Sequence, residues 1–214
     1  IFLTGKAGTG KTTFLKYLKE NSTKNIVVAA PTGVAAINAG GVTLHSLFQL
    51  PFHPFLPTKN NKEDLLAKIR QNKQRQQLLR KMELLVIDEI SMVRCDVMDA
   101  IDTILRHTRR NYHLPFGGVQ LLCIGDLHQL PPVAQNQEWS ILNEYYESPF
   151  FFDSLAIKEQ LPLLIELNKI YRQKEDSFVK LLNKVRNNHM NADDFEDLHL
   201  RYDPTFRPDR DEKY

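Results

Sequence analysis

Short, uninterrupted runs of apolar residues alternate with segments of helical periodicity along most of this chain. Four apolar runs are expected to be strands: Ile1–Thr4, Ile26–Ala30, Leu84–Ile87 and Val119–Ile124. Four segments are expected to be helices: Lys11–Glu20, Gly33–Ala39, Asp96–Arg109 and, further along, Asp176–Asn187. Apolar runs without polar alternation are typical of strands that helices cover on both faces. The pattern therefore predicts an α/β fold with a mainly parallel sheet.

Three other stretches have patterns of their own. Apolar residues recur on one side of Glu63–Met82, whose other side is basic and rich in glutamine, so we expect one further helix there. Three prolines are interleaved with two phenylalanines between Gln49 and Asn61, which predicts an irregular loop. The charged, proline-interrupted segment Arg201–Tyr214 is typical of a linker.

Composition narrows the class of protein. The 214 residues are 42% hydrophobic and 25% charged, as in one large or two small globular domains. The apolar runs are far shorter than the roughly 18 residues of a membrane span, and no secretory leader is visible. The two cysteines, Cys95 and Cys123, suggest neither a disulfide framework nor a metal cluster, so we expect an intracellular location, in cytoplasm or nucleoid, nucleus or mitochondrion. A chain that begins with Ile1 is expected to be part of a longer protein.

The net charge of +2 conceals a local asymmetry. Lys59–Lys81 holds eight basic and two acidic residues, whereas Met190–Tyr214 holds eight acidic and four basic residues. The basic segment either flanks a nucleic acid or forms a solvated helix face, and the sequence leaves both interpretations open.

A phosphate-binding pattern lies between the first expected strand and the first expected helix. Residues 5–12 match G-x-x-x-x-G-K-[ST], in which glycines let backbone N–H groups converge and the helix start adds partial positive charge. We expect ATP to contact Gly5, Ala7, Gly8, Thr9, Gly10, Lys11, Thr12 and Thr13. The Lys11 ammonium would bind the β- and γ-phosphates, and the Thr12 hydroxyl would be a ligand of Mg²⁺. A purely structural glycine-rich turn is the alternative.

Two carboxylates, Asp88 and Glu89, directly follow the expected strand Leu84–Ile87. Consecutive side chains point in different directions at a strand end, so the two can have different roles. We expect Asp88 to hold Mg²⁺, directly or through a water, and Glu89 to orient and deprotonate the attacking water. An acidic cap of the following turn is the alternative. A small-molecule kinase needs no second carboxylate for water, so the pair favours hydrolysis.

A glutamine follows the expected strand Val119–Ile124. Gln129 lies in the segment Gly125–Pro132, where its side chain could hydrogen-bond both the γ-phosphate and the attacking water. It would then report the nucleotide state to whatever the two prolines contact. The alternative is a polar loop held by those prolines.

The order of the motifs is characteristic. They are Gly5–Thr12, Ala30–Ala36, Thr43–Ser46, Asp88–Ser91, Gly125–Pro132 and Tyr171–Gln173. This set resembles the first motor domain of a superfamily 1 DNA helicase of the 5′-to-3′ group. More narrowly, it resembles the petite-integration-frequency (PIF) family, whose signature segment is similar to residues 96–120, and RecD-like enzymes are the next nearest. The resemblance covers about residues 1–190.

This resemblance implies a RecA-like P-loop NTPase domain over residues 1–200, with helices on both faces of the sheet and a small wedge-like insertion at about 49–62. Residues 201–214 would lead to a second RecA-like domain. Gln129 would sense the γ-phosphate, and Arg172 would be an arginine finger, a group whose removal costs about 10³–10⁵ in rate. On the residues alone, an arginine that opens a helix is more often part of a surface ion pair.

The resemblance also implies contacts with single-stranded DNA, made by phosphate binding and base stacking. The residues expected to make phosphate contacts are Pro31, Thr32, Gly33, Val34, His45 and Ser46. Backbone N–H groups at the strand-to-helix turn and the Thr32 hydroxyl suit a phosphate. For His45, a buried histidine at a helix start is the alternative.

The two phenylalanines of the proline-rich loop, Phe52 and Phe55, could stack on the last base pair and help to part a duplex. Their plain alternative is that they cap the hydrophobic core. In either case, prolines stiffen the loop.

Two parts of the family pattern lie outside this chain: the adenine-reading segment before the phosphate loop and the second motor domain. We therefore expect the isolated chain to bind nucleotide weakly and to be almost inactive. In a full-length protein we expect a monomeric, ATP- and Mg²⁺-dependent helicase, not bound to membranes, acting on single-stranded DNA and 5′-tailed DNA in replication, repair and telomere maintenance. A nucleotide-gated nucleic-acid-binding switch and a phosphotransferase are the rival interpretations.

Overall fold

The computed structural model describes residues 1–171, 176–200 and 202–207. The chain divides into two compact units, Ile1–Tyr171 and Arg172–Tyr214. In the second unit, α9 (Asp176–Arg186) and α10 (Ala192–His199) are the described helices. The assignment of residues 1–200 to one motor domain stays a prediction.

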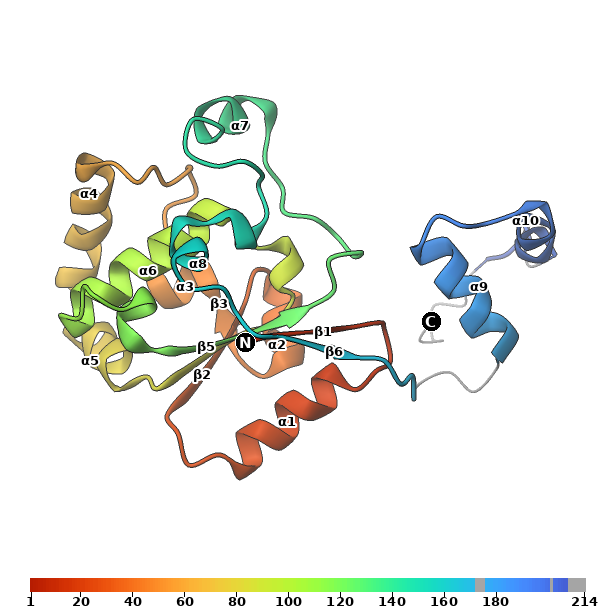
Figure 1. Ribbon diagram of the computed structural model, residues 1–214, viewed down its shortest axis with the longest axis horizontal. Coiled ribbons are helices and arrows are strands. Elements are labelled where there is room, and N and C mark those ends of the chain that lie inside the picture. The colour runs from red at the N-terminus through yellow and green to blue at the C-terminus, as the bar shows by residue number, and fades with distance from the viewer. Residues whose placement is uncertain (172–175, 201, 208–214) are drawn as a thin grey trace. The chain divides into compact units, whose positions relative to one another are not determined.

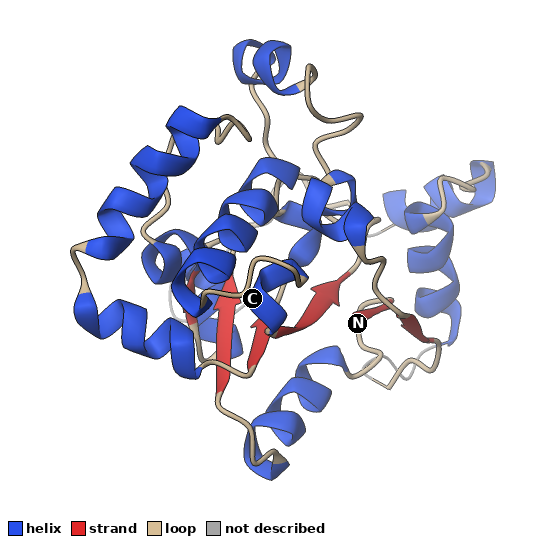
Figure 2. Ribbon diagram, turned by 60° about the vertical axis from the view of Figure 1, so that its left-hand side comes forward, coloured by secondary structure: helices blue, strands red, loops and turns tan. Residues whose placement is uncertain are grey.

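The first unit is built on one parallel sheet (Figures 1 and 2). Its six strands have the spatial order β3-β2-β4-β5-β1-β6. Their bounds are β1 Phe2–Gly5, β2 Ile26–Ala30, β3 Val42–Thr43, β4 Leu84–Ile87, β5 Gln120–Gly125 and β6 Leu164–Leu167. Two predicted strands coincide with β2 and β4, and the other two are offset by one residue from β1 and β5. The short edge strands β3 and β6 were not predicted, because neither carries a long apolar run.

Alternate side chains of the strands pack on opposite faces of this sheet. Five helices cover the face of Leu85 and Ile87: α3 (Leu44–Phe48), α4 (Lys59–Arg70), α5 (Lys73–Lys81), α6 (Cys95–Arg109) and α8 (Leu155–Glu159). The face of Val86 and Ile124 packs against Leu15 and Ala39, which belong to α1 (Lys11–Asn21) and α2 (Gly33–Ala39). The predicted α/β class, with helices on both faces of a parallel sheet, is confirmed.

The prediction of one helix over Glu63–Met82 is wrong, because the chain forms α4 and α5 with a break at Gln71 and Asn72. The Asn72 side chain accepts a hydrogen bond from the Arg75 backbone N–H at 2.9 Å, so it begins a new helix. The predicted loop Gln49–Asn61 is likewise shorter than expected, because α4 begins at Lys59.

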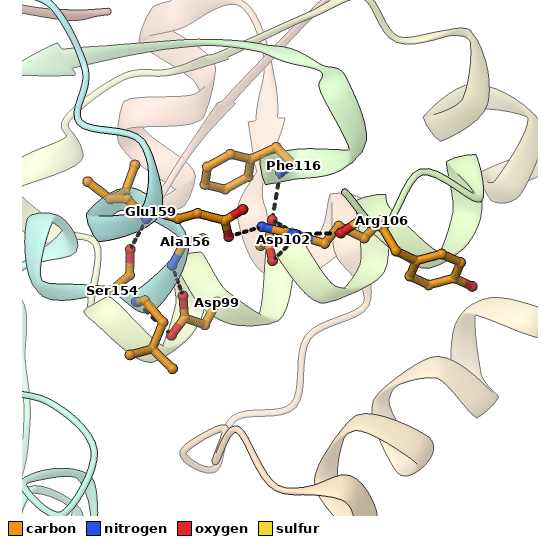
Figure 3. A network of polar contacts seen from close by, with 10 residues as sticks. Asp99, Asp102, Arg106, Phe116, Ser154, Ala156 and Glu159 are labelled. Atoms are coloured by element: carbon orange, nitrogen blue, oxygen red, sulfur yellow. Dashed lines mark hydrogen bonds and ion pairs between the residues drawn. The ribbon is translucent and has the colours of Figure 1, made fainter. Parts of the chain in front are cut away.

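A polar network fixes α6 to its neighbours (Figure 3). Asp99 accepts hydrogen bonds from the backbone N–H groups of Leu155 and Ala156, at 3.1 and 2.9 Å. One turn further, Asp102 accepts from the Phe116 backbone N–H at 2.6 Å and pairs with Arg106. These bonds tie α6 both to α8 and to the 3₁₀ turn η2 (Pro115–Gly118).

The helix α7 (Asn136–Leu142) belongs to the first unit and projects from it on two long loops (Figure 1). Two shorter 3₁₀ turns, η1 (Ile90–Met92) and η3 (Phe151–Asp153), complete the elements. Both cysteines, Cys95 and Cys123, are buried and free. Among the described residues, no helix is long and apolar enough to cross a membrane.

Candidate active site

The predicted motifs meet at one edge of the sheet. Because neighbouring strands run parallel, the segments that follow β1, β2, β4 and β5 all leave from the carboxyl edge. Ligand sites of open parallel sheets lie at this edge. The phosphate loop, the Pro31 turn, the Asp88–Glu89 pair and the Gln129 segment are therefore neighbours.

The phosphate loop has the backbone that its sequence requires. Gly10 precedes α1 with φ 95°, a left-handed conformation that favours glycine. At Gly5 a side chain would meet the Leu167 carbonyl oxygen at 2.6 Å, so only glycine lets β1 lie this close to β6. Thr9 is buried and its hydroxyl donates to the Lys6 carbonyl at 2.8 Å, which closes the loop.

The start of α1 is suited to an anion. No described side chain caps it, and its first turn holds no acidic residue. Its first backbone N–H groups therefore keep their partial positive charge, as in phosphate-binding helix starts. Thr12 and Thr13 lie exposed in this turn, Ala7 is exposed in the loop, and Gly8 is half-buried there.

The Lys11 ammonium lies over the loop that precedes it. It donates to the carbonyl oxygens of Gly5 at 2.6 Å and of Lys6 at 3.1 Å. The same ammonium opposes the effect of burial, which raises the pKa values of Asp88 and Glu89, so it is within electrostatic range of both carboxylates. The structure thus brings together the loop lysine and the acidic pair.

The acidic pair has a constrained backbone. Asp88 continues β4, and its N–H donates to the Ala29 carbonyl at 2.9 Å. Glu89 has φ 52°, a value uncommon for a residue other than glycine. The Glu89 N–H donates to Asp88 Oδ1 at 3.0 Å, and the Glu89 carbonyl accepts from the Met92 N–H at 3.1 Å.

Burial raises the pKa values of both carboxyl groups above their ordinary values. For Asp88 the rise is opposed by the hydrogen bond from the Glu89 backbone and by Lys11. For Glu89, Asp88 and Asp126 add to the rise, and Lys11 opposes it. A carboxylate with a raised pKa is a stronger base than one in water, which suits proton abstraction.

The segment after β5 is organised by Asp126, a residue to which the sequence assigned no role. Asp126 is buried, and its Oδ1 accepts from the His128 N–H at 3.1 Å. Its carbonyl accepts from the Gln129 N–H at 2.9 Å, while the Gln129 side chain lies exposed. The signal that could have revealed it is an aspartate at the start of a turn just beyond a strand.

The described residues hold no cluster of three or more His, Cys, Asp or Glu side chains that could bind a metal ion by itself. The donors near the acidic pair are carboxylate and hydroxyl oxygens. Mg²⁺ prefers such oxygens, and proteins often bind it through one or two carboxylates together with substrate phosphates. The residues present therefore fit a Mg²⁺–nucleotide better than a protein-only metal centre.

The candidate DNA contacts after β2 and β3 lie side by side, because Ala30 and Thr43 pair in register. The Thr32 hydroxyl accepts from the Ala35 N–H at 3.2 Å and so begins α2. Gly33 and Val34 are exposed, and Pro31 is half-buried. Ser46 is exposed in α3, which begins directly after β3.

The two phenylalanines of the proline-rich loop have different environments. Phe52 is 92% exposed and its ring stacks on His45, with centroids 5.7 Å apart and planes inclined by 11°. We call the Phe52–His45 pair the platform. Phe55 is only 4% exposed and packs in the core, which favours the alternative that it caps the core over the predicted contact with DNA. A ring buried in this way has no free face on which a base could stack.

Arg172, the predicted arginine finger, lies outside the described residues. The residue before it, Tyr171, donates from its backbone N–H to the Gly8 carbonyl at 2.8 Å. The segment that leads to Arg172 is thus joined to the phosphate loop.

Comparison with known proteins identifies similar chains. The model of the PIF1-like helicase family matches residues 1–196. The ATP-dependent DNA helicase PIF1 of Candida albicans is 39% identical over 205 residues, which are 92% of this chain and 22% of that protein. The ATP-dependent DNA helicase PIF1 of Homo sapiens is 37% identical over 187 residues, with 87% of this chain and 27% of that protein covered.

Solved structures are also similar. The crystal structure of Pif1 helicase from Bacteroides in complex with ADP-AlF3 and single-stranded DNA superposes with a TM-score of 0.88 and 49% identity. The match covers 98% of this chain and 47% of that chain. This chain therefore spans about a quarter of the curated relatives and about half of the crystallised helicase.

Proposed function

This chain belongs to the PIF1-like helicase family, and from that membership we propose that it is the first motor domain of an ATP-dependent 5′-to-3′ DNA helicase. The observation that carries the proposal is the meeting of the phosphate loop, the Asp88–Glu89 pair and the Gln129 segment at one sheet edge. The similar Bacteroides helicase was crystallised with ADP-AlF3 and single-stranded DNA, which supports a nucleotide and a DNA strand as ligands here.

The phosphate loop and the start of α1 would hold the β- and γ-phosphates of ATP. Converging N–H groups supply hydrogen-bond donors, and Lys11 supplies a full positive charge. Lys11 now donates to two neutral carbonyl oxygens. An incoming phosphate would replace these bonds with ones in which both the donor and the acceptor carry a charge.

Thr12 and Asp88 are the residues that would hold Mg²⁺ beside the phosphates. When bound, the ion neutralises charge on the β- and γ-phosphate oxygens. The hydrogen bond from the Glu89 N–H to Oδ1 restrains the Asp88 carboxylate.

Glu89 would orient and deprotonate the water that attacks the γ-phosphate. Its raised pKa makes the carboxylate a better proton acceptor, and its backbone is held by two hydrogen bonds. Gln129, which follows the neighbouring strand β5, would hydrogen-bond the γ-phosphate and the attacking water. Arg172 would stabilise the charge that develops in the transition state.

Single-stranded DNA would cross the same edge beyond β2 and β3. The exposed turn Pro31–Val34, with Ser46 beside it, would bind backbone phosphates, and a base would stack on the platform. We propose that the loop carrying Phe52 also helps to part a duplex. The helicase would need a second motor domain to close the ATP site, and it would act on DNA with a 5′ single-stranded tail as a monomer.

A directional unwinding assay on the full-length protein tests the proposal. We expect unwinding of a duplex with a 5′ tail, no unwinding of one with a 3′ tail, and ATPase activity that single-stranded DNA stimulates. Glu89→Gln is the matched control, since it keeps the size of the side chain and removes the base. This variant should bind nucleotide normally, and its ATPase rate should be about 10²- to 10⁴-fold lower.

Other outcomes would point elsewhere. Nucleotide-dependent DNA binding without stimulated ATPase would indicate a switch. Stable transfer of phosphate to a small acceptor would indicate a phosphotransferase.

A further inference from the structure

An arginine beside the platform joins segments that are distant in the sequence. Arg94 precedes α6 and donates to Asp96 from Nε at 2.6 Å and from Nη2 at 2.9 Å. Its Nη1 donates to Glu138 of α7 at 2.9 Å. The planar guanidinium thus binds one carboxylate in a two-pronged manner and a second one from its free edge. Arg94 holds α7 against the start of α6.

Asp96 extends this contact to the proline-rich loop. Its Oδ2 accepts from the Phe55 backbone N–H at 2.9 Å, and the Asp96 side chain is almost fully buried. The backbone is therefore anchored just beyond Phe52, whose ring forms the platform with His45. Burial lowers the pKa of His45, Arg94 adds to this effect and Asp96 opposes it, so both charges lie within electrostatic range of the platform.

An apolar cluster joins the same segments a second time. Buried Cys95 of α6 packs with Leu142 and Tyr146, which end and follow α7. Leu56 of the proline-rich loop and Trp139 of α7 pack against this cluster, and both are partly buried. Polar and apolar contacts thus hold α7 and the loop together.

The other end of this connection is the Gln129 segment, which runs through two prolines into α7. Glu138 Oε2 also accepts from the Gln135 backbone N–H at 3.2 Å, so the carboxylate that binds Arg94 also caps α7 at its start. A displacement of Gln129 would reach Glu138 along a loop in which Pro131 and Pro132 restrict the backbone, and would pass from Glu138 to Arg94 through one ion pair.

We propose that Arg94 is a positioning residue that couples the Gln129 segment to the platform, through Glu138 on one side and Asp96 on the other. The inference rests on the proposed function, because it assumes that Gln129 responds to the γ-phosphate and that a DNA base stacks on the platform. Arg94 itself contacts neither ligand. Its role is to make the position of Phe52 depend on the nucleotide state.

The test is Glu138→Gln in the full-length protein. Glutamine can still accept the capping hydrogen bond from Gln135, but it removes the charge that binds Arg94. We expect the ATPase rate stimulated by single-stranded DNA to stay within about twofold, and the base pairs unwound per ATP to fall at least about fivefold. Arg94→Lys keeps the charge but loses the two-pronged geometry. Its number of base pairs unwound per ATP should lie between those of the wild type and Glu138→Gln.

Glu159→Gln is the matched control. Glu159 of α8 pairs with Arg106 of α6 (Figure 3), and this ion pair lies outside the chain of contacts that runs from Glu138 through Arg94 to Asp96. Like Glu138→Gln, Glu159→Gln removes one carboxylate from an ion pair with an arginine. A general loss of stability would therefore affect both variants. We expect this control to unwind like the wild type.

Trp139 provides a second readout, because it packs against the apolar cluster, and the difference in emission between the full-length protein and its Trp139→Phe variant isolates its signal. We expect ADP with aluminium fluoride and Mg²⁺ to change its emission in the wild type and to do so much less in Glu138→Gln, at equal nucleotide occupancy. If the wild type unwinds DNA and Glu138→Gln unwinds the same number of base pairs per ATP, the coupling is overturned but the proposed function is not. A wild type without DNA-stimulated ATPase would overturn the proposed function and the coupling with it.

Discussion

Glu89 combines an unusual backbone with a perturbed side chain. A left-handed conformation costs roughly 1–2 kcal/mol for a residue with a Cβ atom, and it persists where the surrounding contacts impose it. Here those contacts are the bonds to Asp88 and Met92. The strain lies on the residue that also carries a carboxylate with a raised pKa, as is typical of functional sites.

His45 should make stability depend on pH. Burial is the main cause that lowers its pKa from 6.5, with Arg94 adding to the effect and Asp96 opposing it. At pH values between the pKa of His45 in the folded protein and 6.5, the unfolded chain binds more protons than the folded protein. The free energy of unfolding should therefore rise with pH through this window. Above the window the contribution is constant.

Urea unfolding between about pH 5 and about pH 8 measures this dependence. The difference between the wild type and His45→Gln isolates the histidine, since His107 also has a lowered pKa and remains in both proteins. Parallel curves for the two proteins would contradict the assignment.

At the scale of elements, the two phenylalanines of the proline-rich loop differ in burial and therefore in their expected roles. Phe55→Ala should lower the free energy of unfolding by about 3–5 kcal/mol, because it empties a core position. Phe52→Ala should change it by no more than about 0.5 kcal/mol, because the ring is exposed. Chemical denaturation of both variants measures the difference.

The same pair separates stability from function. Phe52→Ala should reduce unwinding by the full-length protein more than its ATPase activity on single-stranded DNA. An equal loss of both activities would argue against a role of the platform in parting a duplex.

The elements that the sequence predicted well are those defined by local patterns. The phosphate loop, β2, β4 and α2 each depend on a continuous run or a short motif, and these lie where expected. The break between α4 and α5 was missed because apolar periodicity continues across Asn72, and the cap only becomes visible in its bond to Arg75.

Contacts between distant segments were beyond the sequence. Nothing in the local pattern distinguishes buried Phe55 from exposed Phe52, because the difference arises from the bond to Asp96 and from the packing of the core. Likewise, the pairing of Arg94 with Glu138 depends on how α7 returns to α6. Asp126 was passed over because its role follows from the turn that it organises.

At the scale of the whole molecule, the proposed function makes the first unit one side of an ATP site. Groups from a second motor domain would complete it, and a further arginine supplied by that domain, in addition to Arg172 of this chain, would be worth about 10³–10⁵ in rate. We therefore expect the isolated chain to hydrolyse ATP at least about 10³-fold more slowly than the full-length protein. A coupled ATPase assay with single-stranded DNA measures this, and robust stimulated turnover by the isolated chain would contradict it.

The burial of both cysteines leaves the folded chain without a reactive thiol. Burial raises the pKa values of Cys95 and Cys123 to about 12, so neither forms a thiolate readily at neutral pH. Thr23 is exposed in the turn between α1 and β2, at the amino edge of the sheet, away from the phosphate loop. A Thr23→Cys variant should therefore take up a single maleimide dye while native, and the wild type should react only in denaturant. A fluorophore placed there would report the binding of nucleotide or DNA by the isolated chain without touching the phosphate loop.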